Sequence, residues 1–143
     1  MSGFTLTEWI NQSPEAVFNF AINPENASKV IEGVTKMEQI SSGPVGVGTR
    51  FREARVVNGK EAVAEMELTS YEPPRSYQMT SEMKGITVSY RYDLAPENGG
   101  TRVNLVCDVS ANGLKKLAAP MVASIMKKED GDHLEKLKAA MGG

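Results

Sequence analysis

A run of short strand-like segments is followed by a single stretch, residues 114–141, in which apolar residues recur at helical spacing. This order constrains the fold more than any other feature of the sequence. An antiparallel sheet buries one face, and an amphipathic element must cover that face. Residues 114–141 are the only segment long enough to do so. The sequence therefore predicts an α+β domain in which a curved, seven-stranded antiparallel sheet packs its concave face against a long C-terminal helix, with an apolar cavity between the layers.

The composition fits one domain, residues 1–143, and argues against several classes of function. A chain of 143 residues buries roughly two thirds of its unfolded surface without a metal or a disulfide. The chain has 16 basic and 18 acidic residues and a formal net charge of -2, so it lacks the basic excess that nucleic-acid binding requires. No apolar run reaches the ~20 residues of a membrane span. Residues 1–10 alternate in polarity, unlike a signal peptide, and the single cysteine has no internal partner, so we expect a cytoplasmic protein.

Local signals predict two short helices between the first strand, at residues 4–10, and the rest of the sheet. Ser13 followed by Pro14, and Asn23 followed by Pro24, each combine an N-cap residue with a proline that suits the first helical turn. We expect the second helix to end at Gly33. Alternating polarity then predicts six further strands, at residues 34–40, 49–57, 61–71, 77–83, 86–94 and 103–109.

The C-terminal helix carries two residues that disfavour an unbroken helix. Pro120 cannot donate its backbone N–H. We therefore expect either a kink at this proline or a separate first turn, with the main helix beginning near Ala119. Gly131 adds a second weak point, since glycine costs about 1 kcal/mol in a helix interior.

Several short sequence motifs occur in the order and spacing that are typical of a known superfamily. They are Ser13-Pro-Glu-Ala-Val-Phe18, Asn23-Pro-Glu25, Gly46-Val-Gly-Thr-Arg50, Tyr71-Glu-Pro-Pro-Arg75 and Gly99-Gly-Thr-Arg-Val103. In these motifs the chain resembles the START-like, or helix-grip, superfamily (SRPBCC). It is most similar to two branches, the polyketide cyclase/dehydrase proteins and the proteins related to the G subunit of carbon monoxide dehydrogenase. The resemblance implies a domain that holds a hydrophobic ligand. The motifs themselves are turn and helix-cap signals, so they imply no particular reaction.

Our leading hypothesis is non-catalytic binding or carriage of a small hydrophobic molecule, such as a lipid, a polyketide or another aromatic metabolite, with no cofactor. The eight methionines suit an adaptable apolar surface, although they equally suit an ordinary core. The candidate ligand-binding residues are Phe51, Arg55, Met66, Tyr77, Met79, Met83, Tyr90, Tyr92, Met121 and Ile125. The tyrosines among them can orient the polar end of a ligand or bond to backbone instead.

A polyketide cyclase or dehydratase is the alternative, and it needs an acid/base group inside the cavity. Glu53 is the candidate, because strand alternation places it and Arg55 on the same face as Phe51. If Phe51 points inward, both charged groups point inward with it. The opposite arrangement, with Ala54 and Val56 inward and the charged pair in solvent, is the one that the usual exposure of charged residues favours.

Other reactive residues give no catalytic or metal site. Cys107 lies between apolar residues on its strand, where we expect an inert thiol, and one histidine with one cysteine cannot supply a zinc set. We expect His133, Asp130 and their acidic neighbours to form a solvated helix surface. A third hypothesis is a factor associated with a membrane or a protein partner, in which the lysine pairs 115–116 and 127–128 contact that partner or peripheral lipid head groups.

Overall fold

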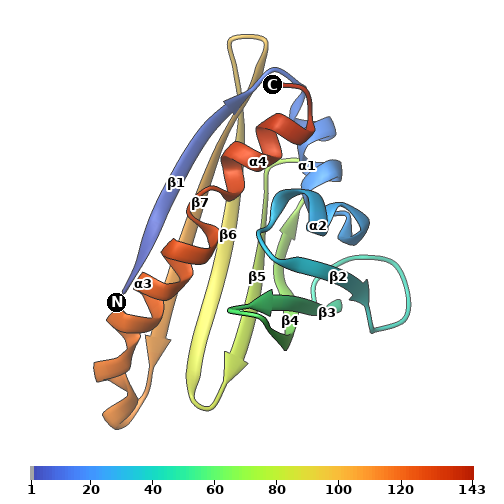
Figure 1. The fold of residues 1–143 in the computed structure, drawn as a ribbon. Coiled ribbons are helices and arrows are strands. Elements are labelled where there is room, and N and C mark those ends of the chain that lie inside the picture. Colours follow the sequence, from blue (N-terminus) through green and yellow to red (C-terminus); the bar gives the residue numbers. More distant parts are fainter. Residues whose placement is uncertain (1) are drawn as a thin grey trace.

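A computed structural model describes residues 2–143, and Met1, the first residue of the expected domain, lies outside the described residues. The chain forms one antiparallel sheet with all of its helices on the concave side (Figure 1). The strands are β1 (Ser2–Ile10), β2 (Val34–Gln39), β3 (Arg50–Val57), β4 (Lys60–Glu72), β5 (Ser76–Met83), β6 (Ile86–Glu97) and β7 (Gly100–Ala111). The helices are α1 (Pro14–Ile22), α2 (Ala27–Val30), α3 (Ala119–Asp130) and α4 (His133–Ala140), with 3-10 helices η1 (Pro24–Asn26) and η2 (Gly113–Ala118).

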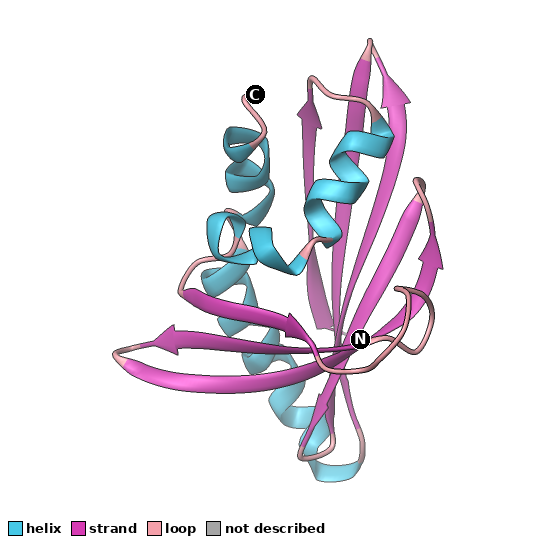
Figure 2. Cartoon of the chain, turned by 90° about the vertical axis from the view of Figure 1, so that its right-hand side faces the viewer, coloured by secondary structure: helices cyan, strands magenta, loops and turns pink. Residues whose placement is uncertain are grey.

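The sheet has the strand order β1-β7-β6-β5-β4-β3-β2. The first strand therefore pairs with the last, and the other strands follow as a meander. Figure 2 shows that β2, β3 and the start of β4 run across the direction of the remaining strands, so the sheet is strongly bent and wraps around the helices. The predicted seven-stranded α+β architecture is confirmed.

Turns and caps follow from the residue types that the sequence places there. The β3–β4 hairpin turns at Asn58 and Gly59, whose φ angles of 52° and 77° are both positive, as the tight hairpin turn between twisted strands requires. The Ser13 side chain accepts a hydrogen bond from the backbone N–H of Ala16 at 3.2 Å. Both short helices form where the cap signals predict them. The second ends at Val30, and Gly33, with φ of 79°, lies in the turn that follows.

The C-terminal helix is broken, and both predicted weak points matter. Pro120 lies in the first turn of α3, after the separate 3-10 helix η2, so the main helix does begin at Ala119. At Gly131 the helix is interrupted, and α4 begins two residues later. The single long helix expected from the spacing is therefore two helices that together cross the concave face (Figure 1). No helix within residues 2–143 is long and apolar enough to cross a membrane.

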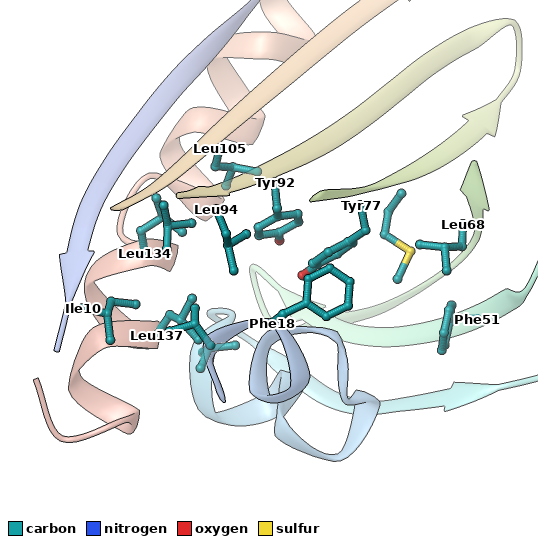
Figure 3. Close-up of a cluster of buried hydrophobic side chains, with 14 residues drawn as sticks. Ile10, Phe18, Phe51, Leu68, Tyr77, Tyr92, Leu94, Leu105, Leu134 and Leu137 are labelled. Carbon is teal, nitrogen blue, oxygen red and sulfur yellow. The ribbon is translucent and has the colours of Figure 1, made fainter. Parts of the chain in front are cut away.

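The core lies between the sheet and the helices and is divided into two clusters. The larger cluster joins α1 and α4 to the central strands, and in Figure 3 Phe18 of α1 lies against Tyr77 of β5, with Tyr92 of β6 beyond it. The ring centroids of Phe18 and Tyr77 are 5.3 Å apart in an edge-to-face arrangement. The smaller cluster packs Ala119 and Ala123 of α3 against Cys107 and Val109 of β7.

Candidate functional site

The concave face of the sheet and the helices α3 and α4 enclose a cavity of about 480 Å³. Its wall is mostly apolar and is built from the inward faces of β3 to β6, the α1–α2 region and the inner side of α3. The predicted ligand-binding residues that line it are Arg55, Met66, Tyr77, Met79, Met83, Tyr90, Tyr92 and Ile125. Their roles as ligand contacts remain a prediction.

Two predicted pocket residues do not line this cavity. Phe51 is fully buried in the larger core cluster. Met121 is 62% exposed and points away from the sheet, because the small residues Ala119 and Ala123 are the ones that pack α3 against it. The neighbouring residues Val122 and Met126 line the cavity instead.

A charged cluster lies on the cavity wall, and it corrects the expectation that Glu53 and Arg55 are solvated. Phe51 points inward, and Glu53 and Arg55 follow it, with side chains only about one tenth exposed (12% and 11%). Arg55 Nε lies 3.3 Å from Glu53 Oε1, and Arg55 Nη2 lies 3.1 Å from Asp130 Oδ1. Asp130, which we expected on a solvated surface, is buried. One guanidinium thus holds two carboxylates from opposite layers of the fold.

Strand register explains why these charges fit inside. Across the β3–β4 ladder, Glu53 stands opposite Ala64 and Arg55 stands opposite Ala62. Both alanines line the cavity and leave room for long side chains. The opposite face of β3 carries Arg50 and Arg52, which pair with exposed glutamates of β4.

Tyr90 extends the cluster from the sheet to α3. Its hydroxyl donates a hydrogen bond to Asp130 Oδ2 and lies 3.6 Å from the sulfur of Met126. Burial and the neighbouring Asp130 carboxylate raise the pKa of Tyr90. The phenol therefore stays protonated and acts as a hydrogen-bond donor to the carboxylate.

His133 is buried, which corrects the prediction that it lies on a solvated surface. Its Nδ1 lies 2.8 Å from the carbonyl oxygen of Val30 and must donate to it, so Nε2 accepts from the hydroxyl of Tyr92, also at 2.8 Å. Burial lowers the pKa of His133 and raises that of Tyr92. Both groups are therefore neutral. Tyr77 stacks on Tyr92, with ring centroids 4.4 Å apart, and fixes the position of this hydrogen-bonded chain.

The charge state of the cluster depends on competition between two carboxylates. Burial raises the pKa of Glu53, the Arg55 guanidinium lowers it, and the Asp130 carboxylate raises it again, with a net upward shift. Burial lowers the pKa of Arg55, but the Glu53 and Asp130 carboxylates raise it by more. Arg55 therefore stays charged, and the raised pKa means that Glu53 takes up a proton more readily than a glutamate in water.

The thiol of Cys107 takes no part in this chemistry. Its side chain is buried, and burial raises its pKa to about 11, so the nucleophilic thiolate is scarce at neutral pH. His133 bonds to Tyr92 and Val30 rather than to the thiol. Among residues 2–143, no group of three or more His, Cys, Asp and Glu side chains is arranged to hold a metal ion.

A sheet that grips a C-terminal helical segment around an apolar cavity defines the class of helix-grip proteins. The chain belongs to the family described as polyketide cyclase / dehydrase and lipid transport, whose model matches residues 1–142. The resemblance seen in the sequence motifs is thus confirmed. Membership of this family supports a role in binding small hydrophobic ligands or in cyclisation. No curated protein sequence matches the chain significantly.

Solved structures share this fold at low sequence identity. The crystal structure of Ara h 8.0201 has a TM-score of 0.77 and 17% identity, covering 96% of this chain and 95% of its own. TTHA0849 from Thermus thermophilus has a TM-score of 0.74 and 20% identity, with 96% and 94% covered. The di-domain ARO/CYC protein BexL from the BE-7585A biosynthetic pathway has a TM-score of 0.79 and 13% identity, with 97% and 46% covered. At these identities the similarity shows the fold alone.

The buried neutral His133 predicts a stability loss in mild acid. Its pKa is lowered by folding from about 6.5, so its contribution is present above that pH and disappears as the pH falls through the folded-state value. We expect urea unfolding to give a lower free energy of unfolding at pH 5 than at pH 7.5, and His133→Gln to reduce this difference. Glu53 has a raised pKa and opposes the trend, but it is present in both proteins and cancels in the comparison. An equal pH dependence in the two proteins would contradict the prediction.

Proposed function

We propose that this protein binds or carries a small hydrophobic molecule in the cavity between the sheet and the helices α3 and α4. The apolar body of the ligand lies against side chains such as Met66 and Met79, and its polar end lies at the cluster of Glu53, Arg55 and Asp130. The observation that carries the proposal is the gathering of buried charged and hydrogen-bonding groups in one part of a mostly apolar wall.

The cavity has the dimensions and chemistry of a ligand site. Its volume of about 480 Å³ falls within the roughly 300–1,000 Å³ of small-molecule pockets, which combine apolar walls with a few polar groups that fix orientation. A closely packed core leaves few voids larger than a water molecule. A space of this size therefore supports a binding role over a purely structural one. The flexible side chains of Met66, Met79 and Met83 suit ligands of varied shape.

A cavity-filling substitution tests this proposal. Native mass spectrometry of the purified protein, followed by a thermal-shift screen of fatty alcohols, aromatic polyketides and quinones, should reveal a retained or stabilising apolar molecule. Ala64→Phe fills the cavity and should abolish the shift in Tm. Val63→Phe, on the opposite face of the same strand and exposed to solvent, should preserve it. The proposal fails if no apolar compound stabilises the wild-type protein, or if both variants respond alike.

A polyketide cyclase or dehydratase is the second candidate, and the environment of Glu53 favours it. A general acid or base works best with a pKa near the working pH, and burial moves the pKa of Glu53 upward. Glu53 also lies on the cavity wall, where it can reach a carbonyl compound. Arg55, whose Nε lies 3.3 Å from Glu53 Oε1, is then the group that orients this carboxyl.

This candidate predicts a separation of turnover from binding. In assays with a poly-β-keto substrate analogue, Glu53→Gln should lower turnover by about 10²-fold or more, the usual contribution of a general acid or base, while the dissociation constant changes little. Glu65→Gln removes a carboxylate from the solvent face of the sheet and should leave turnover intact. Retention of activity in Glu53→Gln would exclude Glu53 as the acid/base group, and absence of turnover in the wild type would leave binding as the function.

A further inference from the structure

We infer that the ligand, if the proposed binding function holds, ends in a group that is not anionic and that donates a hydrogen bond, such as a hydroxyl. This excludes fatty acids and other carboxylates in their ionised form. The inference rests on how the charges and hydrogen bonds of the cavity wall are already used.

The only cation within the cluster is already engaged by carboxylates. Arg55 lies within ion-pair distance of Glu53 on one side and Asp130 on the other. Among the described residues, Arg55 Nε and Asp130 Oδ1 are enclosed and make no well-aligned hydrogen bond, but each lies at ion-pair distance from the cluster, 3.3 Å from Glu53 Oε1 and 3.1 Å from Arg55 Nη2. The guanidinium, the usual partner for carboxylates, is therefore not free for an anionic ligand. The other cation of the wall, Lys84, is exposed in the β5–β6 turn and lies outside the cluster.

The formal charges of all the residues that line the cavity also add up to a negative total, which disfavours an anionic ligand. The charged residues that line the cavity are Glu53, Arg55, Lys84, Glu129 and Asp130. Three carboxylates and two cations give a formal charge of -1 on the wall. A ligand carboxylate would bring another negative charge into a poorly solvated site where like charges already compete, so it would have to take up a proton to bind.

The phenol hydroxyls of Tyr90 and Tyr92 already donate their protons within the wall. Tyr90 donates to Asp130, and Tyr92 donates to His133. What remains on these side chains is acceptor capacity, on the two phenol oxygens and on Glu53 Oε2. A wall rich in acceptors matches a ligand that supplies a donor.

Two ligands that differ only in the polar end test the inference. Calorimetric titration at about pH 8 should show 1-decanol binding at least ~10-fold more tightly than decanoate to the wild-type protein, and the preference should shrink near pH 5, where the acid becomes neutral. Asp130→Asn releases Arg55 from one carboxylate and should narrow the preference. Glu53→Gln releases it from the other, so this variant serves if Asp130→Asn fails to fold.

Each outcome is decisive. Decanoate binding as tightly as 1-decanol at pH 8 overturns the inference and leaves the proposed binding function standing. If the wild-type protein prefers the alcohol and neither Asp130→Asn nor Glu53→Gln changes this preference, the role assigned to the cluster is overturned. Failure of both compounds to bind, with no other apolar compound giving a thermal shift, refutes the proposed function itself.

A second inference rests on a different observation, the exposed apolar stripe of the C-terminal segment. Leu114 is 90% exposed, Leu117 is 85% exposed and Met121 is 62% exposed, and their spacing of three and four residues places them on one side of η2 and α3. Ile125 continues the stripe and also lines the cavity. A contiguous apolar surface of this kind marks an interaction site.

The charges around the stripe point to one kind of partner. Residues 113–128 contain four lysines and no acidic residue, a charge of +4, whereas the remaining residues carry 12 basic and 18 acidic side chains, a charge of -6. Basic residues flanking an apolar helix face are typical of segments that lie in the interface of an anionic membrane. We propose that η2 and the start of α3 dock on an anionic lipid bilayer.

The location fits exchange of a ligand with that bilayer. Lys115 contacts the β5–β6 turn through the carbonyl oxygen of Lys84. The adjacent Met83 is exposed and lines the cavity. The apolar stripe therefore runs beside the exposed rim of the cavity, so that docking would place this rim at the lipid surface.

Vesicle co-sedimentation tests the docking surface. The protein should sediment with phosphatidylcholine vesicles that contain about 30% phosphatidylglycerol, and not with phosphatidylcholine alone, and added salt should weaken binding. The affinity of the double variant Leu114→Ser and Leu117→Ser for the anionic vesicles should be lower by about tenfold or more, because the variant loses much of the apolar contact. The control, Val47→Ser with Val63→Ser, removes exposed apolar residues elsewhere and should bind normally. Equal binding to both vesicle types, or a stable dimer broken by the leucine substitutions, would overturn the proposal.

Discussion

The structure depends on how one bent antiparallel sheet is covered. A sheet of this kind has a single apolar face, and within residues 2–143 two short helices, a 3-10 turn between them and a C-terminal segment broken at Gly131 cover it. Leu134 and Leu137 of α4 are buried in the larger core cluster. Along α3, alanines form the contact with β7, so the helix follows one side of the sheet and the remaining concave surface stays open as the cavity. The site therefore results from incomplete coverage rather than from a dedicated loop.

The charged cluster is better explained by function than by stability. Removing two carboxylates and a guanidinium from water is costly, and replacing a buried ion pair by apolar residues is often neutral or stabilising. Ala62 and Ala64 leave space beside Glu53 and Arg55, which larger apolar residues at the same positions would fill. The cluster also joins β3 to the end of α3 through Asp130. It thereby links the two layers at a polar part of a mostly apolar wall, which is where a ligand can be oriented.

The sequence predicted most of the fold because its signals are local. Ser13, Pro14, Asn23 and Pro24 act through their own caps and backbone geometry, and alternating polarity identified the strands without knowledge of their partners. Strand alternation places Glu53 on the same face of β3 as the apolar Phe51, which indicated an inward position. The usual exposure of charged residues favoured the opposite arrangement, with Glu53 in solvent. Asp130 and His133 could not be assigned from the sequence, since an acidic stretch at a helix end usually lies in solvent. Their burial depends on tertiary partners in β3, β6 and α2, which no local pattern specifies.

The arrangement also bears on what such a site can discriminate. In an apolar cavity lined by methionines, one methylene more or less changes binding by only about 1 to 3 kcal/mol, whereas a buried polar group left without its partner rejects a ligand far more strongly. The His133–Tyr92 pair is buried, and Met83 lies at the exposed rim. A ligand that enters past the rim with its polar end first must lose water before it reaches the acceptors of the cluster. Selectivity should therefore lie in the head group, while the length and shape of the apolar body are tolerated.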